Sequence, residues 1–228
     1  MVISCDDPDD NCRSGAISGT DTRAGSAKAQ AMDGLGTDWV FPCISYKLHA
    51  FCHGLHAMLE AARDLRAGGL VTQDIESIAV VTHPRWLVVC DQPRPATGLQ
   101  AKFSYRLTAA MALANVDTAS LDVYSDATCA RDDLRALRDR VTVQPDHTLS
   151  DCEARVRVRA RGETFEAHHD ILGDVNPAGI KPRLRAKAAT LLGRQAADDL
   201  RAAIDGLGTA EGGLAVLTQR IGKPCTTA

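Results

Sequence analysis

Aromatic side chains are scarce in this chain: Phe, Trp and Tyr make up 4% of its 228 residues. The core must therefore be built from aliphatic side chains and alanine, a composition that favours helix-rich packing. Long apolar runs are missing too, since none approaches the roughly 20 residues that a membrane-spanning helix needs. The net charge of −3 offers no broad basic surface for nucleic acid. We expect neither a membrane nor a nucleic acid as a partner.

The N-terminal sequence, MVISCDDPDDNCRSG, is acidic where a signal peptide would be basic and then apolar. Residues 1–35 show no apolar periodicity, which predicts a disordered leader. We therefore expect a cytoplasmic protein. The eight cysteines are scattered and form no CxxC motif, which indicates free, mostly buried thiols in a reducing compartment.

The first regular elements are predicted in the segment 46–90. Apolar residues recur at helical spacing over 46–66, and two glycines, Gly68 and Gly69, end this run. Two short β-branched runs follow at 75–83 and 85–90, with Pro84 between them. They predict two strands or one bent strand.

A second helix is predicted to begin in the stretch 95–116, where Thr97 and Gln100 fit a capping box. A short charged helix, residues 131–140, runs into a predicted strand, VTVQP, at 141–145. These elements add a further helix and strand to the first group.

The segment 152–169 alternates small apolar residues with arginines and turns at Arg161 and Gly162, which predicts a β-hairpin with one face in water. The arginines could bind an anion, but alternating charge of this kind is more typical of a solvated sheet face. Two helices are predicted after the hairpin, at 182–192 and 195–207.

Strands and helices do not alternate regularly, and no GxGxxG or GxxxxGK[ST] motif follows a strand, which argues against a nucleotide-binding doubly wound fold. The sequence instead predicts an α+β fold: helices packed on a small, largely antiparallel sheet, followed by C-terminal helices.

The stretch YKLHAFCHGLHAMLEAARDL, residues 46–65, carries the most chemistry. On a continuous helix, about a third of the circumference would hold four side chains: His49, Cys52, His53 and His56. Three interpretations follow. Histidines four residues apart can bind zinc, although four ligands on one helical face cannot reach one tetrahedral centre, so we expect no metal. The histidines could also be partly exposed on the helix flank.

The third interpretation is proton chemistry on an anionic substrate. Lys47, at the start of the helix, offers a positive charge or, if desolvated, a base with a lowered pKa. A histidine nearby titrates close to neutrality, so the pair could bind a carboxylate and move a proton on the adjacent carbon.

Three stretches together resemble the MmgE/PrpD family. KLHAFCHGLHAMLEA resembles the pattern that opens the family's C-terminal domain, RPATGLQAKFSYRLTAAMALA resembles its P-x-T-x-x-x-AKFS helix, and KAATLLG resembles the lysine-containing helix that returns to its helical domain. The resemblance covers about residues 36–207. The family includes 2-methylcitrate dehydratase, cis-aconitate decarboxylase and an iminodisuccinate epimerase. It implies a large helical domain, a smaller α+β lid with the active site between them, and no cofactor.

The resemblance also implies site residues. Lys47, Cys52 and His56 fall at catalytic or neighbouring positions, while His49 and His53 match no family position. The second motif implies substrate-binding residues, for which the candidates are Lys102, Ser104 and Tyr105. Where many members carry a tyrosine that faces the active site, this chain has Leu107, and Tyr105 lies two residues earlier.

The resemblance implies a division into the leader 1–35, a lid domain at 36–180 and a helical segment at 181–228. Family members are about twice as long, so the chain is expected to lack most of the helical domain and to be an incomplete enzyme. The expected function is a lyase that acts on a small di- or tricarboxylate. The alternatives are an isomerase or epimerase of the same family and an inactive structural or interaction domain. Expected protein partners are a second copy or a complementing helical domain.

Overall fold

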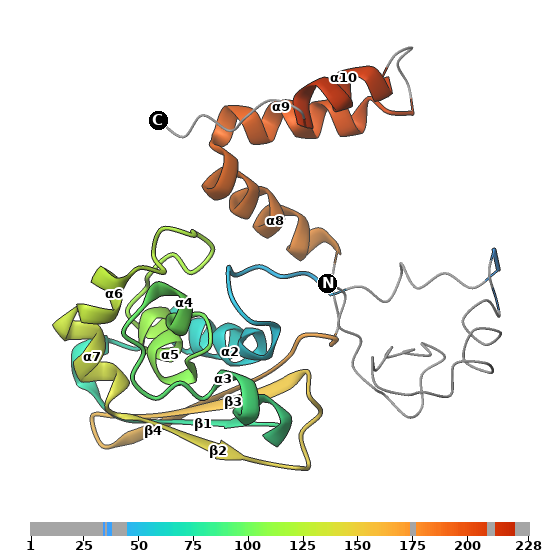
Figure 1. Ribbon diagram of the computed structural model, residues 1–228. Coiled ribbons are helices and arrows are strands. Elements are labelled where there is room, and N and C mark those ends of the chain that lie inside the picture. The colour runs from blue at the N-terminus through green and yellow to red at the C-terminus, as the bar shows by residue number, and fades with distance from the viewer. Residues whose placement is uncertain (1–33, 35, 38–44, 174–176, 209–212, 222–228) are drawn as a thin grey trace, which may run out of the picture.

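The structure, a computed structural model, describes residues 34, 36–37, 45–173, 177–208 and 213–221. A layer of helices covers one face of a sheet, and three further helices extend away from this body (Figure 1). The predicted α+β class with C-terminal helices is confirmed. The predicted leader lies outside the described residues, apart from residue 34.

The sheet has four strands in the order β2-β1-β3-β4. These strands are β1 (Ile75–Thr82), β2 (Val141–Pro145), β3 (Glu153–Ala160) and β4 (Glu163–Asp170). β1 pairs with β2 in parallel, whereas the β1–β3 and β3–β4 pairs are antiparallel. The sheet is therefore mixed but largely antiparallel, as predicted.

The β3–β4 hairpin confirms the alternation seen in the sequence. Arg161 and Gly162, with φ of 55° and 76°, form the turn, where two positive φ values match the twist of a two-residue hairpin. Small apolar side chains of β3, such as Val156 and Val158, are fully buried. The arginines between them face outward and form ion pairs, for example Arg157 with Glu166. This face is solvated, in line with the expectation for alternating charge.

Helix α2 (His56–Ala67) packs on β3 and β4, and α5 (Tyr105–Leu113) packs beside α2. The core between helices and sheet is mostly aliphatic, as the composition predicted, with a few aromatic side chains such as Phe51, Trp86 and Tyr105. The layer is completed by three short helices and a 3-10 turn: α4 (Gly98–Ala101), α6 (Asp126–Ala130), α7 (Asp132–Arg138) and η3 (Thr72–Asp74).

The predicted strand at 85–90 is wrong. These residues form a 3-10 turn, η4 (Pro84–Trp86), that continues into α3 (Leu87–Cys90). The side chain of His83 accepts a hydrogen bond from the backbone N–H of Arg85, and Pro84 takes the first helical position, where its missing N–H is not needed. The β-branched run suggested a buried strand, but Val88 and Val89 are exposed side chains of α3.

The predicted helix over 46–66 begins later than expected, because regular helix starts with η2 (His53–Leu55) and α2. The backbone N–H of Ala50 donates to Thr118 at 3.0 Å, and that of Cys52 donates to Lys102 at 3.2 Å. These donors bond distant segments, so they are not available for a helical turn.

The helix predicted in 95–116 is divided into α4 and α5. Thr97 accepts a hydrogen bond from the N–H of Gln100, so the predicted N-cap is confirmed. Ser104 then caps α5 by accepting from the N–H of Leu107. The chain therefore restarts its helix at Tyr105, three residues after Lys102.

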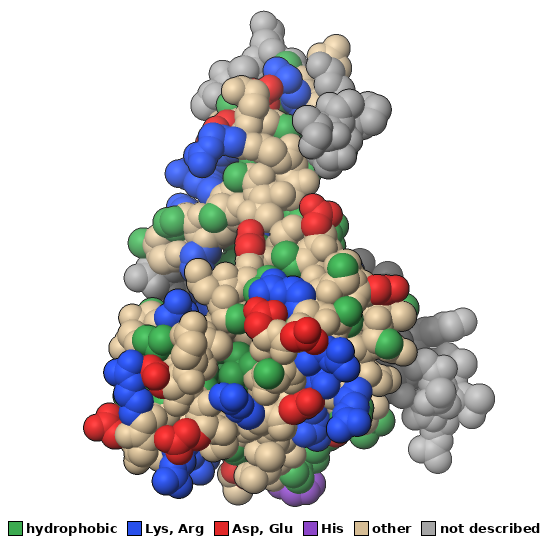
Figure 2. Space-filling view, turned by 90° about the vertical axis from the view of Figure 1, so that its left-hand side faces the viewer, with side chains coloured by type: hydrophobic (Ala, Val, Ile, Leu, Met, Phe, Trp, Pro, Cys, Tyr) green, Lys and Arg blue, Asp and Glu red, His purple; other side chains and the backbone are tan. Residues whose placement is uncertain are grey.

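Helices α8 (Pro177–Leu192), α9 (Arg194–Asp205) and α10 (Gly213–Ile221) extend from the body, and α9 and α10 lie side by side (Figure 1). The predicted domain boundary between residues 180 and 181 lies inside α8. On the face shown in Figure 2, basic and acidic side chains are intermixed over the body. Within the described segments, no helix has the length and apolar character to cross a membrane.

Candidate active site around Lys47 and Cys52

The three histidines of the segment 49–56 form one buried cluster. The ring of His56 lies 5.4 Å from that of His49 and 5.5 Å from that of His53. All three residues are at most 5% exposed. The interpretation as partly exposed residues on a helix flank is therefore wrong, because His49 belongs to a loop that folds back over the start of α2.

His49 connects two distant parts of the chain. Its Nδ1 lies 2.7 Å from the hydroxyl of Thr118, and its Nε2 lies 2.7 Å from a carboxylate oxygen of Glu60. The same oxygen accepts from Arg183 of α8 at 2.5 Å. Burial lowers the pKa of His49. Burial alone would raise the pKa of Glu60, but the hydrogen bonds from His49 and Arg183 outweigh it and hold this pKa well below its usual range.

His56 is held as a neutral imidazole of one tautomer. Its Nδ1 lies 3.3 Å from the carbonyl of Cys52, so it carries the proton and donates. Its Nε2 accepts from the backbone N–H of His49 at 3.4 Å. Burial places its pKa well below the usual value. His56 therefore fixes the loop that carries Cys52.

His53 differs from the other two histidines because its Nε2 is buried and has no hydrogen-bond partner among the described residues. Leaving such a group unpaired typically costs about 1–3 kcal/mol. Burial and the charge of Lys47 lower its pKa. The family resemblance implied no role for His53, and its signal in the sequence was its place between two other histidines.

Cys52 stands at the N-cap of η2 and is partly buried. A hydrogen bond from the thiol of Cys90 lowers its pKa to about 6; burial opposes this, and the backbone N–H groups of Gly54 and His53 and the charge of Lys47 support it. Hydrogen bonding to Cys52 and burial raise the pKa of Cys90. The lowered pKa raises the thiolate fraction of Cys52 at neutral pH, and a thiolate can accept a proton.

Two lysines from opposite ends of the domain meet beside this loop. The side chain of Lys47 is exposed, and the ammonium of Lys187 in α8 donates a hydrogen bond to the carbonyl of Lys47. Burial and the neighbouring charge of Lys47 lower the pKa of Lys187. The KAATLLG stretch thus returns to the first motif, and this pair of cations can hold a carboxylate.

The second motif reaches the same loop through its backbone, since the carbonyl of Lys102 accepts from Cys52. The ammonium of Lys102 lies 5.5 Å from the ring centroid of Tyr124, within reach of a cation–π contact. Ser104 and Tyr105 are fully buried. Their hydroxyls bond protein groups: Ser104 donates to the carbonyl of Gln92 and Tyr105 to that of Gly54. Their substrate-binding role stays a prediction.

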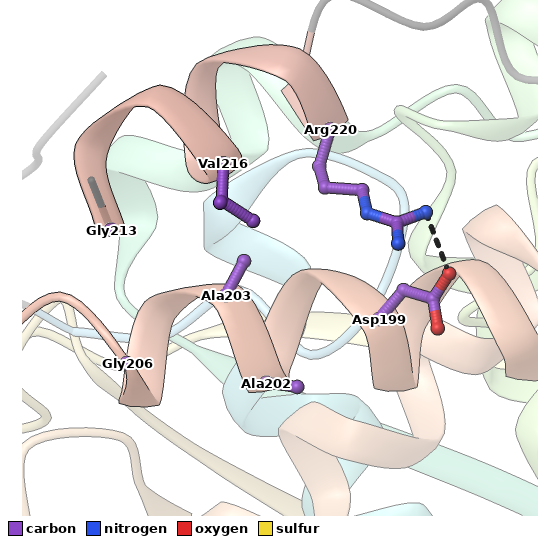
Figure 3. Close-up of a pocket in the computed structure, with 7 residues that line it drawn as sticks. All are labelled: Asp199, Ala202, Ala203, Gly206, Gly213, Val216 and Arg220. Atoms are coloured by element: carbon purple, nitrogen blue, oxygen red, sulfur yellow. Dashed lines mark hydrogen bonds and ion pairs between the residues drawn. The ribbon is translucent and has the colours of Figure 1, made fainter. Parts of the chain in front are cut away.

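A pocket of about 370 Å³ adjoins Lys187 between α8 and the body. Its lining includes Arg63 and Arg183, with His49 and Thr118 at the wall. A second pocket, of about 280 Å³, lies between α9 and α10. Small residues line it, and its two charged side chains, Asp199 and Arg220, pair with each other at 2.9 Å (Figure 3). The first pocket is the better candidate for an anionic ligand.

Among the described residues, no group of three or more His, Cys, Asp or Glu side chains has the arrangement of a metal site. Three of the described cysteines, Cys52, Cys90 and Cys129, are free, as predicted. Cys152 is disulfide-bonded, which contradicts the prediction of free thiols at that position. The chemistry available at the candidate site is thus that of a thiolate, lysines and neutral histidines.

This α+β layer carries Lys47 and Cys52 on the loop before its first long helix, and Lys187 of α8 bonds the same loop. The chain belongs to the MmgE/PrpD family, because the family model of the MmgE/PrpD C-terminal domain matches residues 49–205. The predicted resemblance is confirmed. The comparison with curated proteins found no match.

Proposed function

We propose that the protein acts as an MmgE/PrpD-type lyase, a dehydratase or decarboxylase, on a small di- or tricarboxylate. The observation that carries the proposal is the placement of the Cys52 thiolate on the loop that begins with Lys47, with Lys187 bonded to that loop. A base beside fixed cations is what proton removal next to a carboxylate requires.

In the proposed reaction, Lys47 and Lys187 bind substrate carboxylates and offset the negative charge that develops on the adjacent carbon. The Cys52 thiolate accepts the proton. His56 keeps its neutral tautomer and positions the carbonyl of Cys52. The unpartnered Nε2 of His53 is the buried nitrogen closest in sequence to this thiolate, and we assign it as the group that exchanges a proton with Cys52 or the leaving group.

The proposal is tested by calorimetry with citrate and succinate as probes. Lys47→Ala should weaken citrate binding about tenfold or more, which corresponds to about 1.4 kcal/mol. Lys181→Ala, which removes an exposed lysine from the same helix as Lys187, is the matched control and should bind as the original chain does. Unchanged binding by Lys47→Ala, or equal losses in both variants, would contradict the proposal.

An isomerase or epimerase of the same family would share the first step, because it also removes a proton next to a carboxylate. The two reactions separate in deuterated water. An isomerase returns solvent deuterium to an otherwise intact carbon skeleton, whereas a lyase releases water or carbon dioxide. Mass spectrometry of the product therefore decides between them.

A second candidate function is that of an interaction domain. The helices α9 and α10 and the turn that follows α9 expose large apolar side chains, among them Ile204, Leu207, Leu214 and Ile221. Exposed apolar groups in one region are typical of surfaces that bind another protein. The partner we propose is a second copy or a helical domain that completes the active site. Sedimentation at several concentrations tests self-association; a monomer throughout would exclude the second copy.

A further inference from the structure

The fold brings Cys52 and Cys90 together through a contact that requires glycine. A Cβ at Gly54 would lie 2.3 Å from Cδ2 of Trp86, so only glycine lets η2 approach this ring so closely. Trp86, the N-cap of α3, and Cys90, its last residue, lie four residues apart, which places them on the same side of this helical turn. The contact therefore sets α3 beside the loop that carries Cys52.

Main-chain hydrogen bonds fix the same neighbourhood independently. The N–H of Cys52 bonds the carbonyl of Lys102 at 3.2 Å, and the N–H of Gln92 bonds the carbonyl of the next residue, Phe103, at 3.1 Å. The segments that contain the two cysteines are thus attached to consecutive carbonyls.

The two thiols have the division of roles that a reactive pair needs. Cys52 is partly exposed and accepts a hydrogen bond from the thiol of Cys90, whereas Cys90 is fully buried behind it. A thiolate that a small oxidant can reach reacts first, and an adjacent thiol can then resolve the product. Cys129, the other free cysteine described, is buried, and its thiol bonds the carbonyl of Thr97 instead.

We propose that Cys52 and Cys90 form a peroxide-sensitive dithiol, in which a hydroperoxide oxidises Cys52 and Cys90 closes a disulfide. In the first step the Cys52 sulfur attacks the peroxide O–O bond, forms a sulfenic acid, and the leaving oxygen departs as water or an alcohol once protonated. In the second step the sulfur of Cys90 attacks the Cys52 sulfur, and the hydroxyl leaves as water with the Cys90 proton. Two thiols lose two electrons, and the peroxide gains them.

The disulfide would have a local consequence. It would remove the thiolate from the loop that also holds Lys47 and would attach this loop covalently to α3. A thiol reductant would restore the dithiol by exchange. Oxidation would therefore switch off any activity that uses Cys52, while the dithiol itself does not depend on that activity.

The test is peptide mapping of the reduced full chain after brief exposure to hydrogen peroxide. Trypsin separates the two cysteines into the peptides 48–63 and 86–102, because Arg94 precedes a proline and is not cut. We expect these two peptides to become linked, with the loss of two hydrogens, and to separate again on reduction. A link from Cys52 to any other cysteine, or oxidation of Cys129 as fast as Cys52, would overturn the proposal.

Variants separate the two steps. In Cys90→Ala the sulfenic acid of Cys52 should accumulate and be trapped by dimedone, a cyclic diketone, and the pH at which Cys52 is half-alkylated should move upward from about 6. Cys52→Ser should leave Cys90 unoxidised, and Cys129→Ser should form the link as before. Circular dichroism confirms folding of each variant. The proposal fails if peroxide oxidises Cys52 of the original chain but no disulfide to Cys90 forms. This outcome does not depend on whether the protein turns over a carboxylate.

Discussion

Tyr105 donates a hydrogen bond of 2.7 Å to the carbonyl of Gly54, which joins helix α5 to the turn that follows Cys52. The same hydroxyl lies 3.0 Å from that of Thr82 at the end of β1. One side chain therefore connects the helix layer, the sheet and the candidate active-site loop. Burial raises the pKa of Tyr105, so its hydroxyl stays protonated and able to donate.

Tyr105→Phe should lower the free energy of unfolding by about 1–2 kcal/mol, because it leaves a buried carbonyl and a buried hydroxyl without this partner. Urea titration measures the change. Tyr46→Phe is the matched control and should be neutral, since Tyr46 is 41% exposed. If Tyr105→Phe kept full stability and instead weakened citrate binding, the hydroxyl would serve the substrate rather than the fold.

A paired substitution of glycines tests the contact between Gly54 and Trp86. Gly54→Ala should destabilise the protein by about 1–3 kcal/mol, because the added methyl group meets a ring that is itself buried. Gly179→Ala, in helix α8 with nothing within 4 Å of the new Cβ, should be neutral or stabilising by up to about 1 kcal/mol. Thermal unfolding of both variants measures the difference. Equal effects would show that η2 moves away from Trp86 at no cost.

The elements that were predicted correctly depend on local signals. The β3–β4 hairpin follows from alternation and from the turn at Arg161 and Gly162, and the start of α4 follows from Thr97. The segment 46–52 could not be predicted, because its backbone donors bond Thr118 and Lys102. No local pattern reports hydrogen bonds across such separations in the chain.

The candidate site was predicted only in part, because some of its contacts also join segments that are far apart in the chain. Lys47 and Cys52 were found through a resemblance between motifs, and the structure places them on one loop. His49, however, bonds the hydroxyl of Thr118, 69 residues away, through one ring nitrogen and the carboxylate of Glu60 through the other. Burial of His49 follows from these tertiary contacts, whereas helical spacing alone predicted that the histidines would lie at the edge of the apolar stripe.

The buried histidines predict how stability depends on pH. Each of His49, His53 and His56 has a pKa below its value in the unfolded chain, so below about pH 6.5 the unfolded state binds protons that the folded state does not. The free energy of unfolding should therefore fall as the pH decreases from 6.5, by up to about 1.4 kcal/mol per pH unit for each histidine. Urea titrations between pH 7.5 and 5.5 measure the slope.

The contribution of a single histidine is tested with His56→Gln. This variant should reduce the slope by one proton, in addition to any loss of stability at pH 7.5. A slope equal to that of the original chain would mean that His56 takes up its proton in the folded state.

The carboxylate of Glu60 links α8 to the body, and its removal should be costly. Glu60→Gln keeps the side-chain size but leaves the guanidinium of Arg183 and the ring nitrogen of His49 without the charge that they share. Breaking a buried ion pair in this way typically costs about 3 kcal/mol. Asp64→Asn, one turn further along α2 and exposed, is the control and should change stability by less than about 0.5 kcal/mol.

The difference between Glu60→Gln and the original chain should also depend on pH. Because the pKa of Glu60 is lowered in the folded state, its contribution is complete above the unfolded value of about 4.3 and is lost as the pH falls further. The difference between the two unfolding free energies should therefore begin to shrink below about pH 4 and continue to shrink as the pH falls. A difference that stays constant from pH 7 to pH 3 would show that Glu60 acts through its shape and not through its charge, and that α8 is held to the body by other contacts.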